Sequence, residues 1–251
     1  MPVDSASTRF GDVRRFDSVT STNSVAADLL RAGAGPGLVV VADHQTAGRG
    51  RLDRKWEAPP GSSLLVSVVL AKAWLWEGRL PLASLAMALA ASDACGETTG
   101  LLVRIKWPND LVVGSGMRKV GGILSEVVAV GSSVVVGLGV NVRWGDVAPP
   151  ASGVALDALG ASTEPPAVLA ALLRHLDGRL EDSVERLLDG YRARSATLGQ
   201  EVRVDLGPAG SLTGAAVDIT AYGHLVVDGP DGNRHTVVAG DVITLRPAGA
   251  S

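Results

Sequence analysis

The feature that most constrains the fold of this chain is a long loop between two strongly apolar runs. Residues 38–42 and 63–70 are continuous apolar runs of the length expected for buried β-strands. Between them lie residues 44–65, with the sequence HQTAGRGRLDRKWEAPPGSSLL. The sequence therefore predicts two buried strands joined by a long basic loop, and the remaining elements are interpreted around this unit.

Glycines alternate with arginines inside this loop, at Gly48, Arg49, Gly50 and Arg51. Glycine permits backbone angles that point successive N–H groups into one concavity, and arginine adds a rigid fork that suits carboxylate or phosphate. The loop contains neither the GK[ST] of a Walker loop nor the GxGxxG of a dinucleotide loop. The pattern favours an anion-binding loop, and a solvated basic surface loop is the alternative.

Length and composition bound the class of protein. The 251 residues allow one large domain or a large and a small one, and 46% hydrophobic with 20% charged residues is typical of a soluble globular protein. The net charge of -3 argues against a protein that coats nucleic acid. The single cysteine, Cys95, excludes an internal disulfide. No signal core or membrane-length apolar run is present, so we expect a cytoplasmic protein with no membrane partner.

A helix is predicted to begin at Ser21 or Thr22 and to end at Gly33, because apolar residues recur between them at helical spacing. Ser21, Thr22 and Asn23 then lie together at a helix N-terminus. Capping explains one such residue well but does not explain three in a row. Capping and ligand binding both stay open for these residues.

The rest of the first part of the chain alternates strands and helices. The sequence predicts a buried helix from Pro81, a strand at 102–107, paired antiparallel strands at 118–130 and 132–144, and helical residues 167–194 divided at Gly178. After about residue 197 the chain consists of short β runs separated by Gly, Pro and Asp turns. We therefore expect a first domain at 1–196 and, after a flexible joint, a small SH3-like barrel at 197–251.

The stretch KWPNDL follows the predicted strand at 102–107. Pro108 fixes one turn angle, and Asn109 and Asp110 favour turns while presenting an amide and a carboxylate at a strand end. A hairpin turn alone would explain these residues. The alternative is a ligand site, because α/β folds often bind ligands at strand ends.

Lys119 opens the strand at 118–130, where a lysine usually faces solvent. However, three of the four lysines fall in the stretches already singled out, and this clustering favours an anion-binding role. Asn141 closes the next strand, where it either ends the strand or supports a ligand.

Five motifs, STN, QTAGRGRxxRKW, KWPNDL, RKVGGIL and GLGVNV, stand in the order and spacing found in biotin protein ligases. The chain resembles that family over about residues 15–145, and the terminal barrel is similar in kind. The resemblance implies an α+β fold, a mixed sheet backed by helices as in class II synthetases and biotin–lipoate ligases, followed by an SH3-like barrel. It also implies a two-step reaction, in which biotin reacts with ATP and Mg²⁺ to give biotinyl-5′-AMP and pyrophosphate. A lysine of a carrier protein then attacks the mixed anhydride and releases AMP.

The resemblance also implies roles for individual residues. The residues that would bind biotin are Ser21, Thr22, Asn23, Gln45, Gly48, Arg49, Gly50, Arg51 and Lys119. Of these, Arg49, Arg51 and Lys119 would be catalytic, because a carboxylate and a triphosphate need fixed positive charge to meet. The nucleotide side would consist of Trp56, Asn109, Asp110 and Asn141, with Asp110 as the metal ligand. Asp53 replaces the small residue often found at its position in the family. The effect of this difference on the loop geometry is a question for the structure.

Partners follow from the same resemblance. The chain has no acceptor lysine of the MKM type, so the modified protein would be another one, the biotin carboxyl carrier domain of a carboxylase. Only twenty residues precede Ser21, so we expect the short form of the family, without the DNA-binding domain and without DNA as a partner, as a monomer or weak homodimer. The alternatives are a lipoate-type ligase, which shares the fold and the acyl-adenylate chemistry, and a biotin-sensing regulator without catalysis.

Overall fold

The computed structural model describes residues 8–52, 54–128, 133–147, 149 and 153–245. In the first part of the chain the elements are β1 Asp12–Val19, α1 Thr22–Arg31, β2 Leu38–Gln45, β3 Ser63–Ala71, α2 Pro81–Thr99, β4 Val103–Lys106, β5 Asp110–Val113, β6 Arg118–Val128, β7 Ser133–Asn141, α3 Pro165–Arg179 and α4 Val184–Arg194. Short 3-10 helices lie at Lys72–Trp74, Trp76–Gly78 and Asp157–Leu159.

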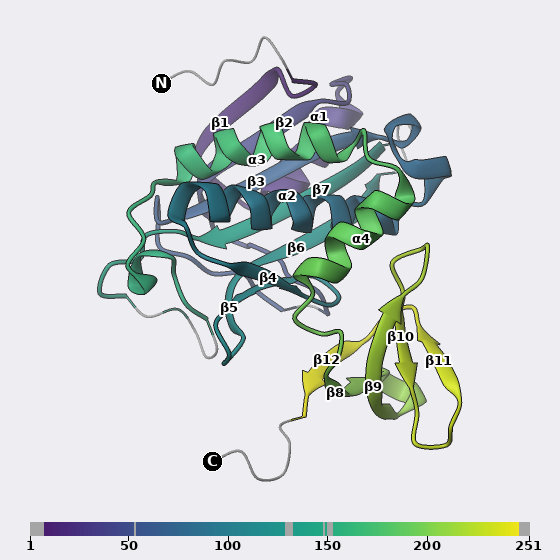
Figure 1. Ribbon diagram of the computed structural model, residues 1–251. Helices are drawn as coiled ribbons and strands as arrows, with labels where there is room; N and C mark the ends of the chain where they lie inside the picture. The colour runs from purple at the N-terminus through teal and green to yellow at the C-terminus, as the bar shows by residue number, and fades with distance from the viewer. Residues whose placement is uncertain (1–7, 53, 129–132, 148, 150–152, 246–251) are drawn as a thin grey trace.

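These strands form one seven-stranded sheet in the order β1-β2-β3-β7-β6-β5-β4. β1 and β2 are parallel, whereas every other neighbouring pair is antiparallel. α2 and α3 cover one face of the sheet and α1 packs on the other (Figure 1). The mixed sheet backed by helices is therefore confirmed, as is the antiparallel pairing of β6 with β7.

The centre of the sheet is its most apolar part. β7 is buried at every position and β3 at all but its last, because both strands have sheet neighbours on each side and helices on each face. The sequence left β1 and β5 unpredicted, and β5 directly follows the turn of KWPND. β1, with the sequence DVRRFDSV, lies at the sheet edge and is largely exposed, so it has no continuous apolar run. β2 continues past the predicted residue 42 to Gln45, which places Gln45 beside Val19 of β1.

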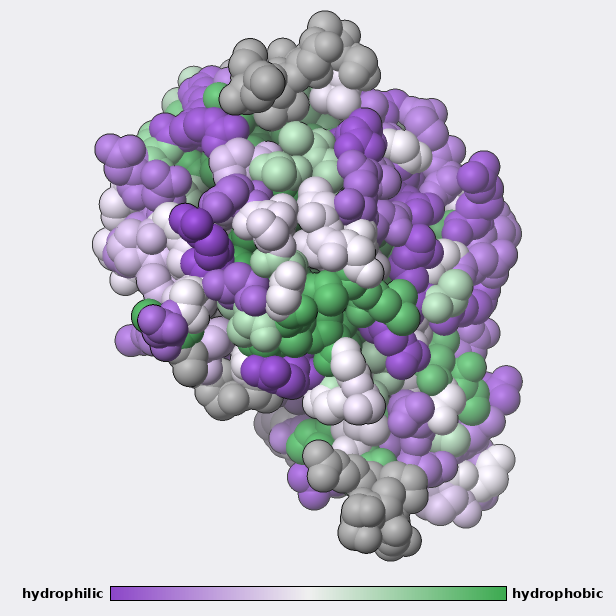
Figure 2. Space-filling model, turned by 60° about the vertical axis from the view of Figure 1, so that its left-hand side comes forward, coloured by the Kyte–Doolittle hydropathy of each residue, from purple (hydrophilic) through white to green (hydrophobic). Residues whose placement is uncertain are grey.

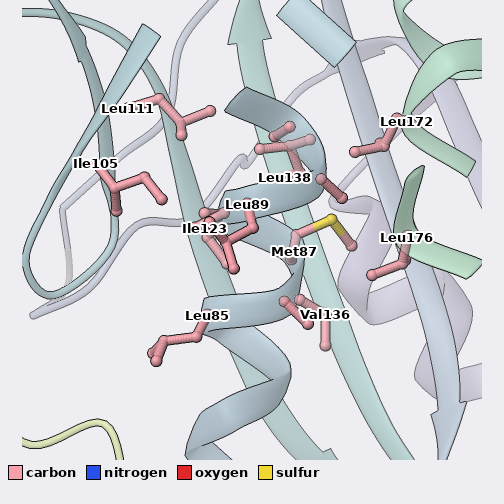
Figure 3. Close-up of a cluster of buried hydrophobic side chains, with 14 of the residues drawn as sticks. Leu85, Met87, Leu89, Ile105, Leu111, Ile123, Val136, Leu138, Leu172 and Leu176 are labelled. Carbon is pink, nitrogen blue, oxygen red and sulfur yellow. The ribbon is translucent and has the colours of Figure 1, made fainter. Parts of the chain in front are cut away.

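α2 forms the core between the sheet and α3. Its side chains Leu85 and Leu89 lie on the side of the sheet residues Ile105 and Ile123, whereas Met87 points toward Leu176 of α3 (Figure 3). Apolar residues therefore cover nearly all of its faces, as predicted for a helix buried on several sides. The helix begins at Pro81, as the sequence indicated.

The helical stretch at 167–194 divides, but the predicted dividing point was wrong. Gly178 lies inside α3, and the chain leaves helical structure between Leu180 and Ser183. Ser183 then caps α4, its Oγ accepting a hydrogen bond from the backbone N of Arg186 (3.3 Å). A capping serine starts a new helix, whereas one glycine weakens a helix by only about 1 kcal/mol.

The C-terminal part is a second, five-stranded antiparallel sheet (Figure 1). Its strands are β8 Glu201–Asp205, β9 Ser211–Ile219, β10 Leu225–Asp228, β11 Arg234–Val237 and β12 Asp241–Thr244, with a 3-10 helix at Gly207–Ala209. The order is β11-β10-β9-β8-β12, so β11 and β12 end the sheet over the described residues. The short strands separated by turns are confirmed, and closure into an SH3-like barrel stays a prediction.

The junction between the two sheets is hydrogen-bonded to β4 and does not form the free joint we expected. The backbone N of Ala196 donates to the carbonyl of Ile105 (2.7 Å). The backbone N of Trp107 donates to Oγ1 of Thr197 (2.9 Å). The placement of a domain boundary at 196/197 remains our proposal, but these residues are fastened to the first sheet.

The surface is mostly hydrophilic. On the face drawn in Figure 2, hydrophobic residues gather in one central area that hydrophilic residues surround. Over the described parts of the chain, no helix is both long and apolar enough to cross a membrane.

Candidate functional site

The first part of the site is a buried polar cluster at the N-terminus of α1. Ser21, Thr22 and Asn23 are each only 4% exposed. Gln45, at the end of β2, accepts hydrogen bonds through Oε1 from the backbone N (2.8 Å) and the hydroxyl (3.1 Å) of Thr22. Ser21 occupies the N-cap position, but its side chain makes no capping hydrogen bond. Side-chain capping therefore does not explain this serine, which lines a cavity together with Thr22 and Asn23.

Ser67 and Glu126, neither of which was predicted, complete this cluster. The hydroxyl of Ser67 lies 2.7 Å from Oγ1 of Thr22 and 2.6 Å from Oδ1 of Asn23. The amide nitrogen of Asn23 donates to the carboxylate of Glu126 (2.6 Å) and to the carbonyl of Leu124 (3.1 Å). The sequence feature that could have predicted them is that each residue interrupts an apolar strand, Ser67 in SLLVSVVLA and Glu126 in GGILSEVV. A polar residue at such a position needs a buried partner.

Arg49 connects the basic loop to the polar cluster. Its Nη2 donates to Oε2 of Glu126 (2.9 Å) and to the hydroxyl of Ser24 (3.2 Å). Glu126 thus receives hydrogen bonds from both Asn23 and Arg49. The loop and the N-terminus of α1 therefore share one carboxylate.

The basic loop is folded back on itself as a short hairpin. Arg49 and Lys55 form an antiparallel bridge, the N of Gly50 donates to the carbonyl of Arg54 (2.6 Å), and the N of Trp56 donates to the carbonyl of Gly48 (3.0 Å). Asp53, whose effect on the loop geometry was in question, lies outside the described residues.

The C-terminal sheet also contacts this loop. Nη1 of Arg51 donates long hydrogen bonds to Oδ1 of Asn109 (3.5 Å) and to the carbonyl of Gly240 (3.4 Å). Arg54 forms an ion pair with Asp241, at the start of β12. The loop arginines therefore lie between the KWPND stretch and the second sheet.

Trp56 packs on a floor of glycines in β6 and β7. A Cβ atom added to Gly139 would lie 2.5 Å from the indole ring, and one added to Gly122 would lie 3.3 Å from it. At Gly137, a Cβ atom would lie 2.3 Å from Oδ1 of Asn23. The GLG glycines are therefore required by close approach, because a larger residue at Gly137 or Gly139 would displace Asn23 or Trp56. In the GG pair, a Cβ atom at Gly121 would lie 2.8 Å from the carbonyl of Gly139. The indole N–H of Trp56 is buried without a partner among the described residues.

Lys119 points into the cleft, so the solvent-facing alternative does not hold. Its Nζ lies 2.6 Å from Oδ1 of Asp110 and 5.6 Å from the centroid of the Trp56 ring. Asn109, beside Asp110, donates through Nδ2 to the carbonyl of Ile123 (2.8 Å). Among the described residues no three His, Cys, Asp or Glu side chains cluster as metal ligands would. Asp110 is thus a single carboxylate that already binds an ammonium group.

Asn141 lies at the far end of the cleft. It is 5% exposed, and its Nδ2 donates to the carbonyl of Val154 (3.2 Å). Its Oδ1 is buried with no partner in the described chain. This oxygen lines a cavity of about 130 Å³ together with Trp56, Lys119 and Trp144. A buried acceptor without a donor destabilises the folded state, so this site suits a ligand with an N–H group that donates to the oxygen.

Apart from Asp110, the predicted site residues line adjoining cavities that share Trp56 as a wall. A narrow inner cavity of about 40 Å³ is bounded by Ser21, Thr22, Asn23, Gln45, Arg49, Gly50, Trp56, Asn109 and the glycine floor. An outer cavity of about 600 Å³ is bounded by the loop from Gln45 to Glu57 and by Leu124. Polar groups converge at the inner end, and cations surround the middle. The cleft therefore combines hydrogen-bonding groups, positive charge and an aromatic wall, a combination that suits a small ligand with an anionic group.

Two family models match the chain. Residues 15–142 match the Biotin/lipoate A/B protein ligase family, and residues 197–244 match the Biotin protein ligase C terminal domain. A biotin–[acetyl-CoA-carboxylase] ligase of Mycobacterium tuberculosis is 39% identical over 93% of this chain and 90% of that protein. The enzyme of the same name from Paracoccus denitrificans is 33% identical over 88% and 97%. The chain therefore belongs to the biotin/lipoate A/B protein ligase family, and its second matched domain places it with the biotin protein ligases.

A solved structure extends this likeness to three dimensions. The biotin protein ligase of Aquifex aeolicus in complex with biotin and ATP has a TM-score of 0.79 to this chain at 28% identity. The match covers 94% of this chain and 100% of that one, so it includes both sheets.

Proposed function

We propose that this protein is an ATP-dependent ligase that activates biotin as biotinyl-5′-AMP and transfers it to a lysine of a biotin carboxyl carrier domain. The observation that carries this proposal is the order of groups along the cleft: the polar cluster at α1, the loop arginines, Lys119, and the unpartnered oxygen of Asn141. Biotinyl-5′-AMP presents a ureido ring, a carboxyl group, a phosphate and an adenine in the same order. The names of the M. tuberculosis and Paracoccus relatives support the proposal.

The inner end of the cleft suits the ureido ring of biotin. That ring offers two N–H donors and one carbonyl acceptor, and the polar cluster offers hydroxyl and amide groups on Ser21, Thr22, Asn23 and Gln45. Ile123, Leu124 and Leu138, which also line this cavity, give an apolar surface for the remainder of the molecule. A few converging polar groups in an otherwise apolar pocket are typical of small-molecule sites.

In the first step, a carboxylate oxygen of biotin forms a bond to the α-phosphorus of ATP, and the bond from that phosphorus to the bridging oxygen of pyrophosphate breaks. Two anions must approach each other for this reaction. Lys119, Arg49 and Arg51 supply the positive charge that offsets their repulsion and stabilises the charge that develops on the phosphoryl oxygens.

The nucleotide is expected on the side of Trp56 and Asn141. The amino group of adenine would donate to Oδ1 of Asn141, which lacks a donor in the described chain, and Trp56 would pack beside the base. Mg²⁺ would enter with the triphosphate, since it usually keeps phosphate and water ligands. Asp110 alone, bonded to Lys119, does not form a resident metal centre, and we assign no step to the metal.

In the second step, the neutral amine of a carrier lysine attacks the carbonyl carbon of the mixed anhydride, the carbon–oxygen bond to phosphate breaks, and AMP leaves. The carrier domain would belong to an acetyl-CoA or other acyl-CoA carboxylase, and acetyl-CoA carboxylase is the substrate in the names of the two relatives. Because ATP is the cosubstrate, a cytoplasmic location is part of the proposal.

The experiment that tests the first step is isotope exchange between ATP and pyrophosphate, run with biotin, with lipoate and with neither. We expect exchange with biotin alone. Exchange that prefers lipoate would assign the protein to the other branch of its family. Biotin binding without exchange would instead identify a sensor.

A further inference from the structure

Trp107 belongs to the KWPND motif and lines a separate cavity beside the ligand cleft, together with Arg51 and Asn109. It is 3% exposed, and its two N–H groups both donate toward the C-terminal part of the chain. The backbone N donates to Oγ1 of Thr197 (2.9 Å), and the indole Nε1 donates to the carbonyl of Gly223 (3.0 Å). Its neighbours Asn109 and Asp110 contact the loop arginine Arg51 and Lys119. One short stretch therefore links the second sheet to the cleft.

The segment that Trp107 contacts is a tight turn between β9 and β10. The N of Thr220 donates to the carbonyl of His224 and the N of Gly223 to that of Thr220, both at 2.8 Å. Gly223 has a φ of +76°, and a Cβ atom there would lie 3.1 Å from Leu85 of α2. The turn thus approaches α2 as closely as a glycine allows and directs its carbonyl at the indole.

The same sheet contacts the basic loop at a second point. Asp241 pairs with Arg54, and the carbonyl of Gly240 accepts from Arg51. The side chain of Arg54 is 70% exposed, and pairs of this kind contribute little when they act alone. The geometry of these two arginine contacts therefore depends on the position of the second sheet. The hydrogen bonds of Trp107 help to fix that position.

From these contacts we infer that Trp107 is a positioning residue for adenylate formation. Its indole fixes the β9–β10 turn, and through the sheet this fixes Gly240 and Asp241 against the arginines of the loop. The inference rests on the proposed function, because the arginines matter here as the groups that meet phosphate. Trp107 itself touches no substrate.

The test compares Trp107→Phe with a matched control, Trp76→Phe. The indole N–H of Trp76 also donates to a backbone carbonyl, that of Asp182 (2.6 Å). Trp76 and Asp182 both lie in the first part of the chain, and neither lines the cleft. Each variant deletes one indole N–H and keeps an aromatic ring. Both should lose a similar amount of stability in urea unfolding.

The two variants should differ in kinetics. We expect Trp107→Phe to lower kcat/KM for ATP in biotin-dependent pyrophosphate exchange about tenfold, the effect of one lost hydrogen bond, with the Kd for biotin unchanged. Its amide hydrogens at 220–228, and those at 48–56 in the biotin-bound state, should exchange faster. Trp76→Phe should match the wild type in both respects. Equal kinetics and equal exchange for the two variants would overturn the inference.

A second variant approaches the same contact from the other side. Gly223→Ala places a methyl group against Leu85 and should reproduce the kinetic and hydrogen-exchange changes of Trp107→Phe. Wild-type behaviour of folded Gly223→Ala would also count against the inference. If the wild type shows no biotin-dependent exchange of pyrophosphate, the proposed function fails. Amide hydrogen exchange at 48–56 would then still decide whether Trp107 positions the loop.

Discussion

At the scale of single residues, the cleft depends on polar side chains placed inside apolar strands. Ser67 lies in β3, Glu126 in β6 and Asn141 at the end of β7. A buried polar group destabilises a fold by about 1–3 kcal/mol unless it has a partner. Ser67 and Glu126 have partners within the cluster, whereas Oδ1 of Asn141 has none among the described residues. The cluster is thus preformed, and the nucleotide end is completed only by a ligand.

Lys119 carries the first residue-level prediction. Replacing it with alanine should slow adenylate formation by at least about 10²-fold, because it removes a cation from a site where charge develops. The unfolding free energy should change by less than about 1 kcal/mol, since the ion pair with Asp110 is partly exposed. Pyrophosphate exchange and urea unfolding measure the two effects. Lys72→Ala, at an exposed position, is the control, and near-normal exchange by folded Lys119→Ala would reject the role.

Cys95 gives a prediction about pH. Burial in α2 raises the pKa of its thiol to about 12, from an ordinary value of 9.0. The stability that this shift contributes is complete below pH 9 and is lost between pH 9 and 12, because the unfolded thiol ionises first. The loss from this group amounts to about 1.4 kcal/mol per pH unit. Unfolding of the wild type and of Cys95→Ala between pH 8 and 11 measures it, and parallel curves would contradict it.

At the scale of elements, the basic loop between β2 and β3 decides access to the cleft. The inner cavity of about 40 Å³ is smaller than the several hundred Å³ typical of ligand pockets, and Arg49, Gly50 and Trp56 of the loop form part of its wall. A ring can therefore enter only if the loop moves. The loop cations give a reason for such movement. Arg49 and Arg54 are paired with Glu126 and Asp241, whereas Arg51 and Lys55 form no ion pair among the described residues and would attract an incoming anion.

We therefore predict that residues 48–61 exchange their amide hydrogens rapidly without ligand and become protected by biotin, and more strongly by a non-hydrolysable analogue of biotinyl-5′-AMP. Ordering about a dozen residues costs several kcal/mol, which contacts to the phosphate and to Trp56 offset. Closure would also keep water from the mixed anhydride. Equal protection with and without ligand would show a preformed loop.

The glycine floor gives the second element-level prediction. Gly139→Ala should weaken the binding of biotin and ATP about tenfold, because its methyl group would lie 2.5 Å from the Trp56 ring and the indole must shift. Gly116→Ala is the matched control, since a Cβ atom there meets nothing within 4 Å. Isothermal titration of both variants tests this. Unchanged affinity in Gly139→Ala would mean that Trp56 does not depend on the floor.

The elements that could be predicted are those whose signal is local. The apolar runs of β2 and β3, the start of α2 at Pro81 and the β6–β7 pair follow from residues close together in sequence. β1 was missed because an exposed edge strand carries charges, and the break before Ser183 was misplaced because glycine is a weaker signal than a cap. Ser67 and Glu126 were missed for another reason. The residues that Ser67 and Glu126 contact lie far away in the sequence, so no local sequence pattern identifies these contacts.

At the scale of the whole molecule, the two sheets meet where the chemistry is expected. Arg51 of the loop donates a hydrogen bond to the carbonyl of Gly240, and Arg54 forms an ion pair with Asp241 at the start of β12. The motifs predicted the residues of the first sheet's cleft but not this contact, which depends on how the two parts pack. Oligomeric state and the absence of a DNA partner stay predictions.

The central proposal is that this cleft makes and uses biotinyl-5′-AMP. The most direct measurement is the mass of a purified biotin carboxyl carrier domain after incubation with the protein, biotin, ATP and Mg²⁺. We predict an increase of one biotinyl group on a single lysine, dependent on ATP and absent with the Lys119→Ala variant. An unmodified carrier domain, in the presence of a folded protein that binds biotin, would contradict the account.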